Sequence, residues 1–400
     1  MSLNSTPSAD RVHIGIFGRR NAGKSSLINA LTGQSLAIVS DVAGTTTDPV
    51  SKAMELLPLG PVVMIDTAGL DDVGELGALR VKKTYQVLNK TDIALLVVSS
   101  AEGMTEEDRQ LLERIKEKKL AYLVVYSKTD IASSPELDQN SIAVSAETGE
   151  NINELKERIA ALAKEEKAEF PIISDKVTAG DLAVLVIPID SAAPKGRLIL
   201  PQQQTIRELL DCGCTSVVTR ETELADTLAK LAVKPKVVIT DSQAFGKVSK
   251  IVPEDIQLTS FSILFARHKG SLTEQVRGAA QIDKLKNGDT VLISEGCTHH
   301  RQCGDIGTVK LPMFIKKRTG LDDLNFVFTS GTEFPDDLSP YSLVIHCGGC
   351  MLNEREMKYR IKCAQDAGVR ITNYGVAIAH CNGILKRSLG IFPEALSCLG

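Results

Sequence analysis

The feature that most constrains the fold is a phosphate-binding loop near the N-terminus of this 400-residue chain. The motif GRRNAGKS (residues 18–25) has Walker A spacing and lies between an apolar strand pattern at 12–17 and a helix pattern at 26–31. In such a loop the backbone N–H groups point at phosphates, Lys24 reaches the β- and γ-phosphates, and the Ser25 hydroxyl ligates magnesium. We therefore expect an α/β nucleotide-binding domain here.

Four further motifs follow in the order found in GTPases. They are Gly44-Thr45-Thr46-Thr47-Asp48, Asp66-Thr67-Ala68-Gly69, Ser127-Lys128-Thr129-Asp130 and Ser145-Ala146. On these residues the chain resembles the TrmE/Era-like branch of translation-factor-type GTPases. The resemblance implies that Thr46 closes on magnesium and γ-phosphate and that Asp66 holds magnesium through water. It also implies that Asp130 reads the guanine edge, with support from Ala146.

The predicted nucleotide site combines these motif positions. Its binding residues are Asn21, Ala22, Gly23, Lys24, Ser25, Ser26, Thr46, Asp66, Lys128, Asp130, Ser145 and Ala146. Its expected catalytic residues are Lys24, Thr46, Asp66 and Gly69, and its expected magnesium ligands are Ser25 and Thr46.

The base-reading motif departs from the family pattern, because it begins with Ser127 where the family has asparagine. Serine is shorter and has fewer hydrogen-bonding groups, so we expect a reduced affinity for guanine. Asp130 can still accept two hydrogen bonds from guanine N1 and N2, and adenine lacks that donor pair. A preference for GTP is therefore expected to survive.

Hydrolysis requires a group other than the usual glutamine, since Leu70 occupies the position where Ras-like enzymes carry it. Asn21 matches the asparagine that helps bind a monovalent cation in the potassium-activated members of this branch, and the alternative is a turn-forming residue without an ion contact. Glu75 is either a water-orienting residue or a solvated one. The sequence alone leaves both choices open.

A second set of chemically reactive residues lies far from the first. It consists of Cys297, His299, His346, Cys347 and Cys350. The first two end one predicted strand and the other three follow another, so we expect the two groups to meet at the carboxyl ends of a parallel sheet. A Cys-x-x-Cys turn places two thiolates on one centre, and these residue types suit structural zinc and an iron-sulfur cluster equally well.

Behind a TrmE/Era-like GTPase domain, this pattern closely resembles the HydF family, the GTPases that mature iron-iron hydrogenase, over essentially the whole chain. The resemblance implies that Cys297, Cys347 and Cys350 hold a 4Fe-4S cluster with one iron open to cargo. His299 and His346 would be labile ligands or would hydrogen-bond the cluster or its cargo. The family serves as scaffold or carrier for a two-iron precursor, working with two radical-SAM maturases and the apo-hydrogenase.

These observations predict three α/β domains. They are a P-loop GTP-binding domain at 1–172, a small dimerisation domain at 173–264 and an iron-sulfur cluster domain at 265–400. The middle segment carries no chemical motif, and its role follows from the resemblance. Its run Leu182-Ala-Val-Leu-Val-Ile-Pro is long and apolar for an exposed edge, which favours a sheet that continues across a homodimer over an internal sheet edge.

Composition excludes several other classes. No apolar run of about 18 residues exists and the first ten residues are polar, so we expect a cytoplasmic protein without a membrane segment. Nine cysteines without an export signal argue against a disulfide framework, and we interpret Cys212 and Cys214 as buried structural thiols. A net charge of -4 lacks the basic bias of a nucleic-acid binder.

The resulting hypothesis is a GTPase in which hydrolysis gates the exchange of partners during hydrogenase assembly. Its main rival is a ribosome- or RNA-associated Era/TrmE-like GTPase with a structural zinc domain. Residues 263–400 carry only a small excess of basic side chains and no RNA-binding signature, which argues against that rival. A redox enzyme is a third alternative, but no flavin, nicotinamide or radical-SAM pattern accompanies the cysteines.

Overall fold

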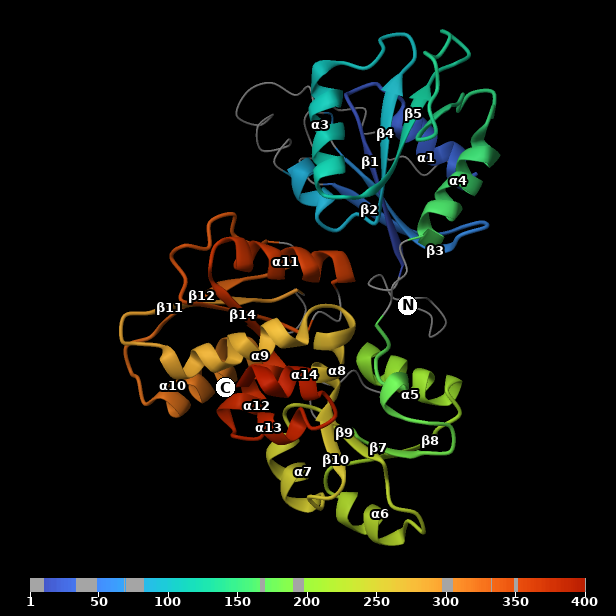
Figure 1. Cartoon of the computed structure of the whole chain (residues 1–400). Coiled ribbons are helices and arrows are strands. Elements are labelled where there is room, and N and C mark those ends of the chain that lie inside the picture. Colours follow the sequence, from blue (N-terminus) through green and yellow to red (C-terminus); the bar gives the residue numbers. More distant parts are fainter. Residues whose placement is uncertain are drawn as a thin grey trace. The chain divides into compact units, whose positions relative to one another are not determined.

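The computed structural model describes residues 11–33, 49–67, 69, 83–165, 170–189, 198–296, 305–331, 333–348 and 352–399. The chain divides into two compact units, Met1–Ala168 and Glu169–Gly400. Both units consist of parallel-rich sheets and helices, which confirms the predicted α/β class (Figure 1). Within the described residues, no helix is both long enough and apolar enough to cross a membrane.

The first unit is built on one six-stranded sheet in the order β2-β3-β1-β4-β5-β6. Its strands are β1 Val12–Phe17, β2 Val50–Leu56, β3 Gly60–Asp66, β4 Ile93–Ser99, β5 Ala121–Ser127 and β6 Ser141–Ala143. All neighbouring strands run parallel except β2 and β3. Its helices include α1 Lys24–Thr32, α3 Glu106–Glu117 and α4 Ile152–Glu165.

The core of the first unit lies on both faces of this sheet. Side chains of α1 and α4 pack on one face and those of α3 on the other. All seven residues of β4 are buried, as expected for a central parallel strand covered on both sides. Functional residues of such a sheet are accessible at the carboxyl ends of the strands, where β1 leads into the phosphate-binding loop.

The second unit contains two four-stranded sheets, both entirely parallel. The first has the order β10-β9-β7-β8, with β7 Leu182–Val186, β8 Thr215–Thr219, β9 Val237–Thr240 and β10 Gln257–Ser260. The second has the order β12-β11-β13-β14, with β11 Thr290–Ser294, β12 Asn325–Thr329, β13 Leu343–His346 and β14 Arg370–Asn373.

Ten α-helices surround these two sheets in the described part of the second unit. They are α5 Leu200–Asp211, α6 Leu224–Lys230, α7 Phe245–Ile251, α8 Phe261–His268, α9 Leu272–Ala280, α10 Leu311–Thr319, α11 Glu354–Asp366, α12 Tyr374–Cys381, α13 Leu385–Ser388 and α14 Pro393–Leu396. Side chains of α12, α13 and α14, including Leu385 and Ala395, belong to the same core cluster as the first sheet. The C-terminal helices therefore stabilise the middle segment of the sequence, while the three domain boundaries expected above stay a prediction.

Two expectations for the middle segment were wrong. β7, which contains most of the run expected at a subunit edge, lies inside the sheet between β9 and β8. Its apolar side chains are accounted for by burial within one chain, and β8 is an edge strand instead. The apolar run Leu258 to Leu264, whose pattern in the sequence predicts a further short strand, ends as a strand at Ser260 and continues as α8. The Ser260 hydroxyl accepts from Ile263 N–H and thereby caps this helix.

Glu208 on α5 holds the segment that enters the second unit, and this contact gives a pH-dependent prediction. Its carboxylate accepts N–H bonds from Ile172, Ile173 and Ser174 at 3.0, 2.8 and 2.8 Å. Burial acts to raise the pKa of Glu208, but the three donors outweigh it and lower the pKa below its usual value. The ionised carboxylate therefore stabilises the folded state at neutral pH.

We expect Glu208→Gln to lower the free energy of unfolding by about 1 kcal/mol at pH 7, because the side chain retains contact with water. The loss should shrink as the pH falls below the ordinary value of 4.5, since wild-type Glu208 then becomes protonated. Urea unfolding followed by circular dichroism at several pH values measures the difference, with the exposed Glu333→Gln as control. A loss independent of pH would show that the charge of Glu208 is not responsible.

Candidate functional site

The phosphate-binding loop is held in shape by its own lysine and by two glycines. Gly18 and Gly23 have φ of 141° and 95°, and a Cβ added at Gly18 would lie 2.3 Å from the carbonyl oxygen of Val97. Lys24 is 8% exposed, and its Nζ donates to the carbonyl oxygens of Gly18 and Arg19 at 2.9 and 2.7 Å. The ammonium group thus lies inside the loop that the motif predicts as the phosphate cradle.

Ser25 and Asp66 face each other at the end of β3, in an arrangement that suits a magnesium ion. The Ser25 hydroxyl lies 3.4 Å from Asp66 Oδ2, and Asp66 Oδ1 is buried and has no hydrogen-bond partner among the described residues. Burial raises the pKa of Asp66, although Lys24 and Ser25 act in the opposite direction. A hydroxyl and a carboxylate with a free lone pair are the oxygen ligands that magnesium prefers.

The two base-reading segments meet as the motifs predict. Ser145 is fully buried, and its hydroxyl donates to Asp130 Oδ1 at 2.6 Å. The same hydroxyl accepts from Thr148 N–H at 3.2 Å. Ser145 therefore fixes the orientation of the carboxylate that is expected to read guanine, and Ala146 follows it directly along the chain.

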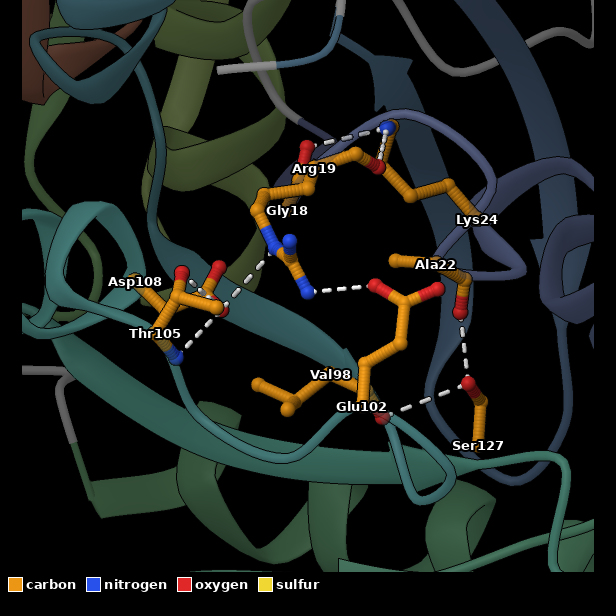
Figure 2. Close-up of polar contacts among 9 residues, drawn as sticks. All are labelled: Gly18, Arg19, Ala22, Lys24, Val98, Glu102, Thr105, Asp108 and Ser127. Atoms are coloured by element: carbon orange, nitrogen blue, oxygen red, sulfur yellow. Dashed lines mark hydrogen bonds and ion pairs between the residues drawn. The ribbon is translucent and has the colours of Figure 1, made fainter. Parts of the chain in front are cut away.

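Ser127 connects the base-reading motif to the phosphate-binding loop. Its side chain is buried, and its hydroxyl donates to the carbonyl oxygen of Ala22 at 2.5 Å (Figure 2). It also lies 3.3 Å from the carbonyl oxygen of Val98. A Cβ added at Gly23 would come within 3.4 Å of Ser127 Cβ, so the two segments are in close contact. The short serine side chain thus fits this position and tethers the loop.

We expect Ser127→Ala to weaken GDP and GTP binding about tenfold, because Ala22 would lose a buried hydrogen bond worth about 1.4 kcal/mol. Equilibrium titration with a fluorescent guanine nucleotide measures the two Kd values. Ser133→Ala, an exposed serine further along the same loop, is the matched control. If Ser127→Ala binds both nucleotides like the wild type, the tether has no role in affinity.

Arg19 anchors the other side of the phosphate-binding loop through two carboxylates (Figure 2). Its NH2 group donates to Glu102 Oε2 at 2.5 Å, and its Nε lies 3.5 Å from Asp108 Oδ2. Asp108 is 1% exposed, and its Oδ2 also accepts from the N–H and hydroxyl of Thr105 at 3.1 and 3.0 Å. The loop is therefore connected to the first turn of α3 as well as to β5.

The second group of predicted residues lies at neighbouring strand ends in the second unit. β11 and β13 are adjacent and parallel, with Ser294 opposite His346. Two residues beyond Ser294, Gly296 N–H donates to Cys347 Sγ at 3.0 Å. A Cβ added at Gly296 would lie 2.7 Å from Leu352 Cγ, so the backbone reaches this thiol only because the residue is glycine. The backbone at the end of β11 thus contacts directly the sulfur atom that is expected to bind the cluster.

His346 directly precedes Cys347 in the chain and is fully buried. Its Nδ1 is 2.6 Å from the carbonyl oxygen of Cys347, and its Nε2 is buried and finds no hydrogen-bond partner in the described part of the chain. Burial lowers the pKa of His346 to about 4, and the nearby Arg360 acts in the same direction. The imidazole is therefore neutral at physiological pH, the form in which histidine can accept a hydrogen bond or ligate a metal.

Arg360 on α11 connects the elements around Cys347. It is fully buried, and its guanidinium donates to Glu356 Oε1, Ser294 Oγ and the Gly331 carbonyl oxygen at 2.9, 2.9 and 3.0 Å. These contacts join the end of β11 to the loop after β12 and to the first turn of α11. Asn353 caps the same helix by accepting from Glu356 N–H at 3.1 Å.

Sequence reasoning did not identify Arg360, Arg19 or Gly296. The signal for Arg360 was its spacing of four residues from Glu356 beside the apolar stripe of a predicted helix. The positive φ of Asn21, 59°, was equally open to prediction, since asparagine is enriched in left-handed turns.

Several predicted site residues lie outside the described residues. They are Thr46, Leu70, Glu75, Cys297, His299 and Cys350. Two other predicted residues are described. Gly69 is partly exposed to solvent, and Ser26 is exposed. Within the described ranges, no three His, Cys, Asp or Glu side chains come together as a metal site.

Comparison with known families separates the two units. The first unit matches the model of the 50S ribosome-binding GTPase family over residues 13–128. The second matches the hydrogen maturase F dimerization domain over 172–270 and the hydrogen maturase F tetramerization domain over 273–391. The two maturase models together cover more than half of the chain.

Individual relatives match mainly through the GTPase part. The tRNA modification GTPases MnmE of Nitrosomonas europaea and Aquifex aeolicus are 40% and 37% identical over 159 and 153 residues, which is 38% and 37% of this chain. The matched region spans only 34% of either relative's length. Era in complex with MgGDPNP and a 16S ribosomal RNA fragment aligns at 21% identity and a TM-score of 0.35, covering 52% of this chain and 91% of Era. The G domain of T. maritima FeoB aligns at 25% identity and a TM-score of 0.30, covering 38% and 99%.

The nucleotide-binding motifs, in their order along the chain and on this sheet, define a P-loop GTPase with a TrmE/Era-like G domain. With the two maturase models added, the chain belongs to the HydF family of hydrogenase maturation GTPases.

Proposed function

We propose that this protein carries a 4Fe-4S cluster on Cys297, Cys347 and Cys350, and that it acts in the cytoplasm as scaffold and carrier of a two-iron precursor for apo iron-iron hydrogenase. The observation that supports this most is the parallel pairing of β11 with β13. It brings the segments before Cys297 and around Cys347 to the carboxyl ends of two adjacent strands. The N–H of Gly296 on Cys347 Sγ fits a thiolate ligand. A bound cluster would supply an iron site for cargo, and His299 or His346 would contact it.

GTP hydrolysis is proposed to gate partner exchange. Lys24 and the loop N–H groups bind the phosphates, and Asp130, oriented by Ser145, selects guanine. Ser25, Thr46 and Asp66 would hold magnesium, which neutralises phosphate charge when bound. Asn21 would help bind a potassium ion beside the phosphates, while its left-handed backbone equally suits a turn without an ion.

Self-association is proposed to use the edge strand β8. Val218 on this strand is 49% exposed, and β8 pairs only with β7 among the described strands. A half-paired edge strand with an exposed valine is the kind of surface that another copy of the chain can extend. The two radical-SAM maturases and the apo-hydrogenase are the proposed further partners.

The experiment that tests the carrier function is activation of apo-hydrogenase by protein that has been loaded with both maturases present. We expect hydrogen evolution with the wild type and none with Cys347→Ser. Dissociation of each maturase is then timed in GTP and in GDP, and a faster release in one nucleotide state supports gating. Equal release rates would remove gating, and activation by Cys347→Ser would remove the carrier role.

A further inference from the structure

The turn between α5 and β8 contains two thiols in direct contact. Cys212 and Cys214 flank Gly213, and their Sγ atoms lie 3.5 Å apart. Cys212 Sγ also lies 3.3 Å from the carbonyl oxygen of Leu209, and Cys214 Sγ lies 3.2 Å from that of Thr178. Neither thiol takes part in the nucleotide site or in the surroundings of Cys347.

We propose that Cys212 and Cys214 form a reversible dithiol and disulfide pair that exchanges with small-molecule disulfides such as glutathione disulfide. A disulfide bond is about 2.05 Å long, so closure requires the sulfur atoms to approach by about 1.5 Å. The pairing thus needs only a small local movement of the two sulfur atoms. Two thiols already in contact reach that distance far more often than two thiols that meet by chance.

The backbone of this turn is fixed around the pair. Gly213 has φ of 77°, which ends α5 with a left-handed residue. Cys214 N–H donates to the Leu209 carbonyl oxygen at 2.9 Å, and Gly180 N–H donates to that of Gly213 at 3.0 Å. The two cysteines are therefore held on either side of one tight turn, at the start of the edge strand β8.

The two thiols differ in access, which sets the order of the exchange. Cys214 is 5% exposed, whereas Cys212 is partly exposed and is the one that a solvent-borne disulfide can reach. Burial, followed by the contact with Cys212, raises the pKa of Cys214 to about 11. Cys214 therefore remains a protonated thiol at neutral pH, and the more accessible Cys212 is the entry point.

The exchange proceeds in two balanced steps. The Cys212 thiolate attacks one sulfur of glutathione disulfide, which forms a mixed disulfide and releases one glutathione thiolate. Cys214 then loses its proton to water and attacks Cys212 Sγ, which releases the second glutathione. The cysteine pair is oxidised by two electrons, and the glutathione disulfide is reduced to two thiols.

Peptide mapping tests this directly, because trypsin cleaves after Arg207 and Arg220 and the peptide between them contains these two cysteines and no other. The full-length, anaerobically purified protein is treated in its native state with glutathione disulfide and then alkylated. We expect the wild-type peptide to lose both alkylation sites and two hydrogen atoms in mass, and dithiothreitol to reverse the change.

Cys214→Ser supplies the matched control, since Cys212 then has no neighbouring thiol to displace glutathione. This variant should retain glutathione on Cys212 as a stable adduct. Full alkylation of both wild-type cysteines after treatment would overturn the proposal. So would a stable glutathione adduct on the wild-type peptide, because it would show that Cys214 cannot attack Cys212.

Discussion

Replacing Lys24 with alanine should lower kcat/KM for GTP hydrolysis by about 100- to 1,000-fold. This is the usual effect of removing one preorganised hydrogen-bond donor that stabilises the charge of a transition state. The structure places this ammonium group inside the loop, bonded to the carbonyl oxygens of Gly18 and Arg19. From there a bound γ-phosphate replaces backbone oxygens as the partner of Nζ.

Steady-state phosphate release with GTP measures this effect. Lys116→Ala, an exposed lysine on α3 of the same unit, should hydrolyse GTP like the wild type. Circular dichroism and thermal unfolding of the apo-protein show whether Lys24→Ala still folds. A folded Lys24→Ala protein with wild-type kcat/KM would mean that the loop does not form the catalytic phosphate site.

The second large effect is expected in the other unit, where Arg360→Met should lower the free energy of unfolding by about 3–5 kcal/mol. The substitution leaves the buried Glu356 carboxylate without its cation and removes the donors to Ser294 and Gly331. Methionine fills part of the space but offers no hydrogen bond. The end of β11, which precedes Cys297, would lose its connection to α11.

Urea unfolding of the apo-protein measures this loss. Lys358→Met is the matched control on the same helix, because Lys358 forms only an exposed pair with Glu354, worth about 0.5 kcal/mol or less. Adding Glu356→Gln to Arg360→Met should recover part of the loss, since the orphaned charge is then removed. Equal losses for Arg360→Met and Lys358→Met would show that the buried network contributes little.

The sequence was sufficient for the parts of the site that are written as local motifs. The phosphate-binding loop needs glycine at fixed positions, and the structure shows why at Gly18, where any Cβ would meet Val97. Likewise, the pairing of Asp130 with Ser145 follows from motif order, because both segments end neighbouring parallel strands. The strand patterns at 289–294 and 342–345, each a short apolar run before a polar group, likewise agree within one residue with the observed β11 and β13.

Contacts between distant segments could not be predicted in this way. Ser127 was interpreted as a weakened guanine contact, whereas its hydroxyl bonds to Ala22, 105 positions away in the chain. Arg360 reaches Ser294 across 66 positions. The place of β7 inside its sheet depends on which strands flank it, and an apolar run is equally compatible with a buried central strand and with a subunit edge.

The central claim is that this GTPase holds an iron-sulfur cluster at the carboxyl ends of the adjacent strands β11 and β13. The most direct test is the iron, sulfide and zinc content of anaerobically purified wild type and Cys347→Ala, with electron paramagnetic resonance after dithionite reduction. We expect about four irons per wild-type chain and a reduced-cluster signal that Cys347→Ala lacks. One tightly bound zinc per chain, with no sulfide and no signal even after anaerobic reconstitution, would contradict the claim.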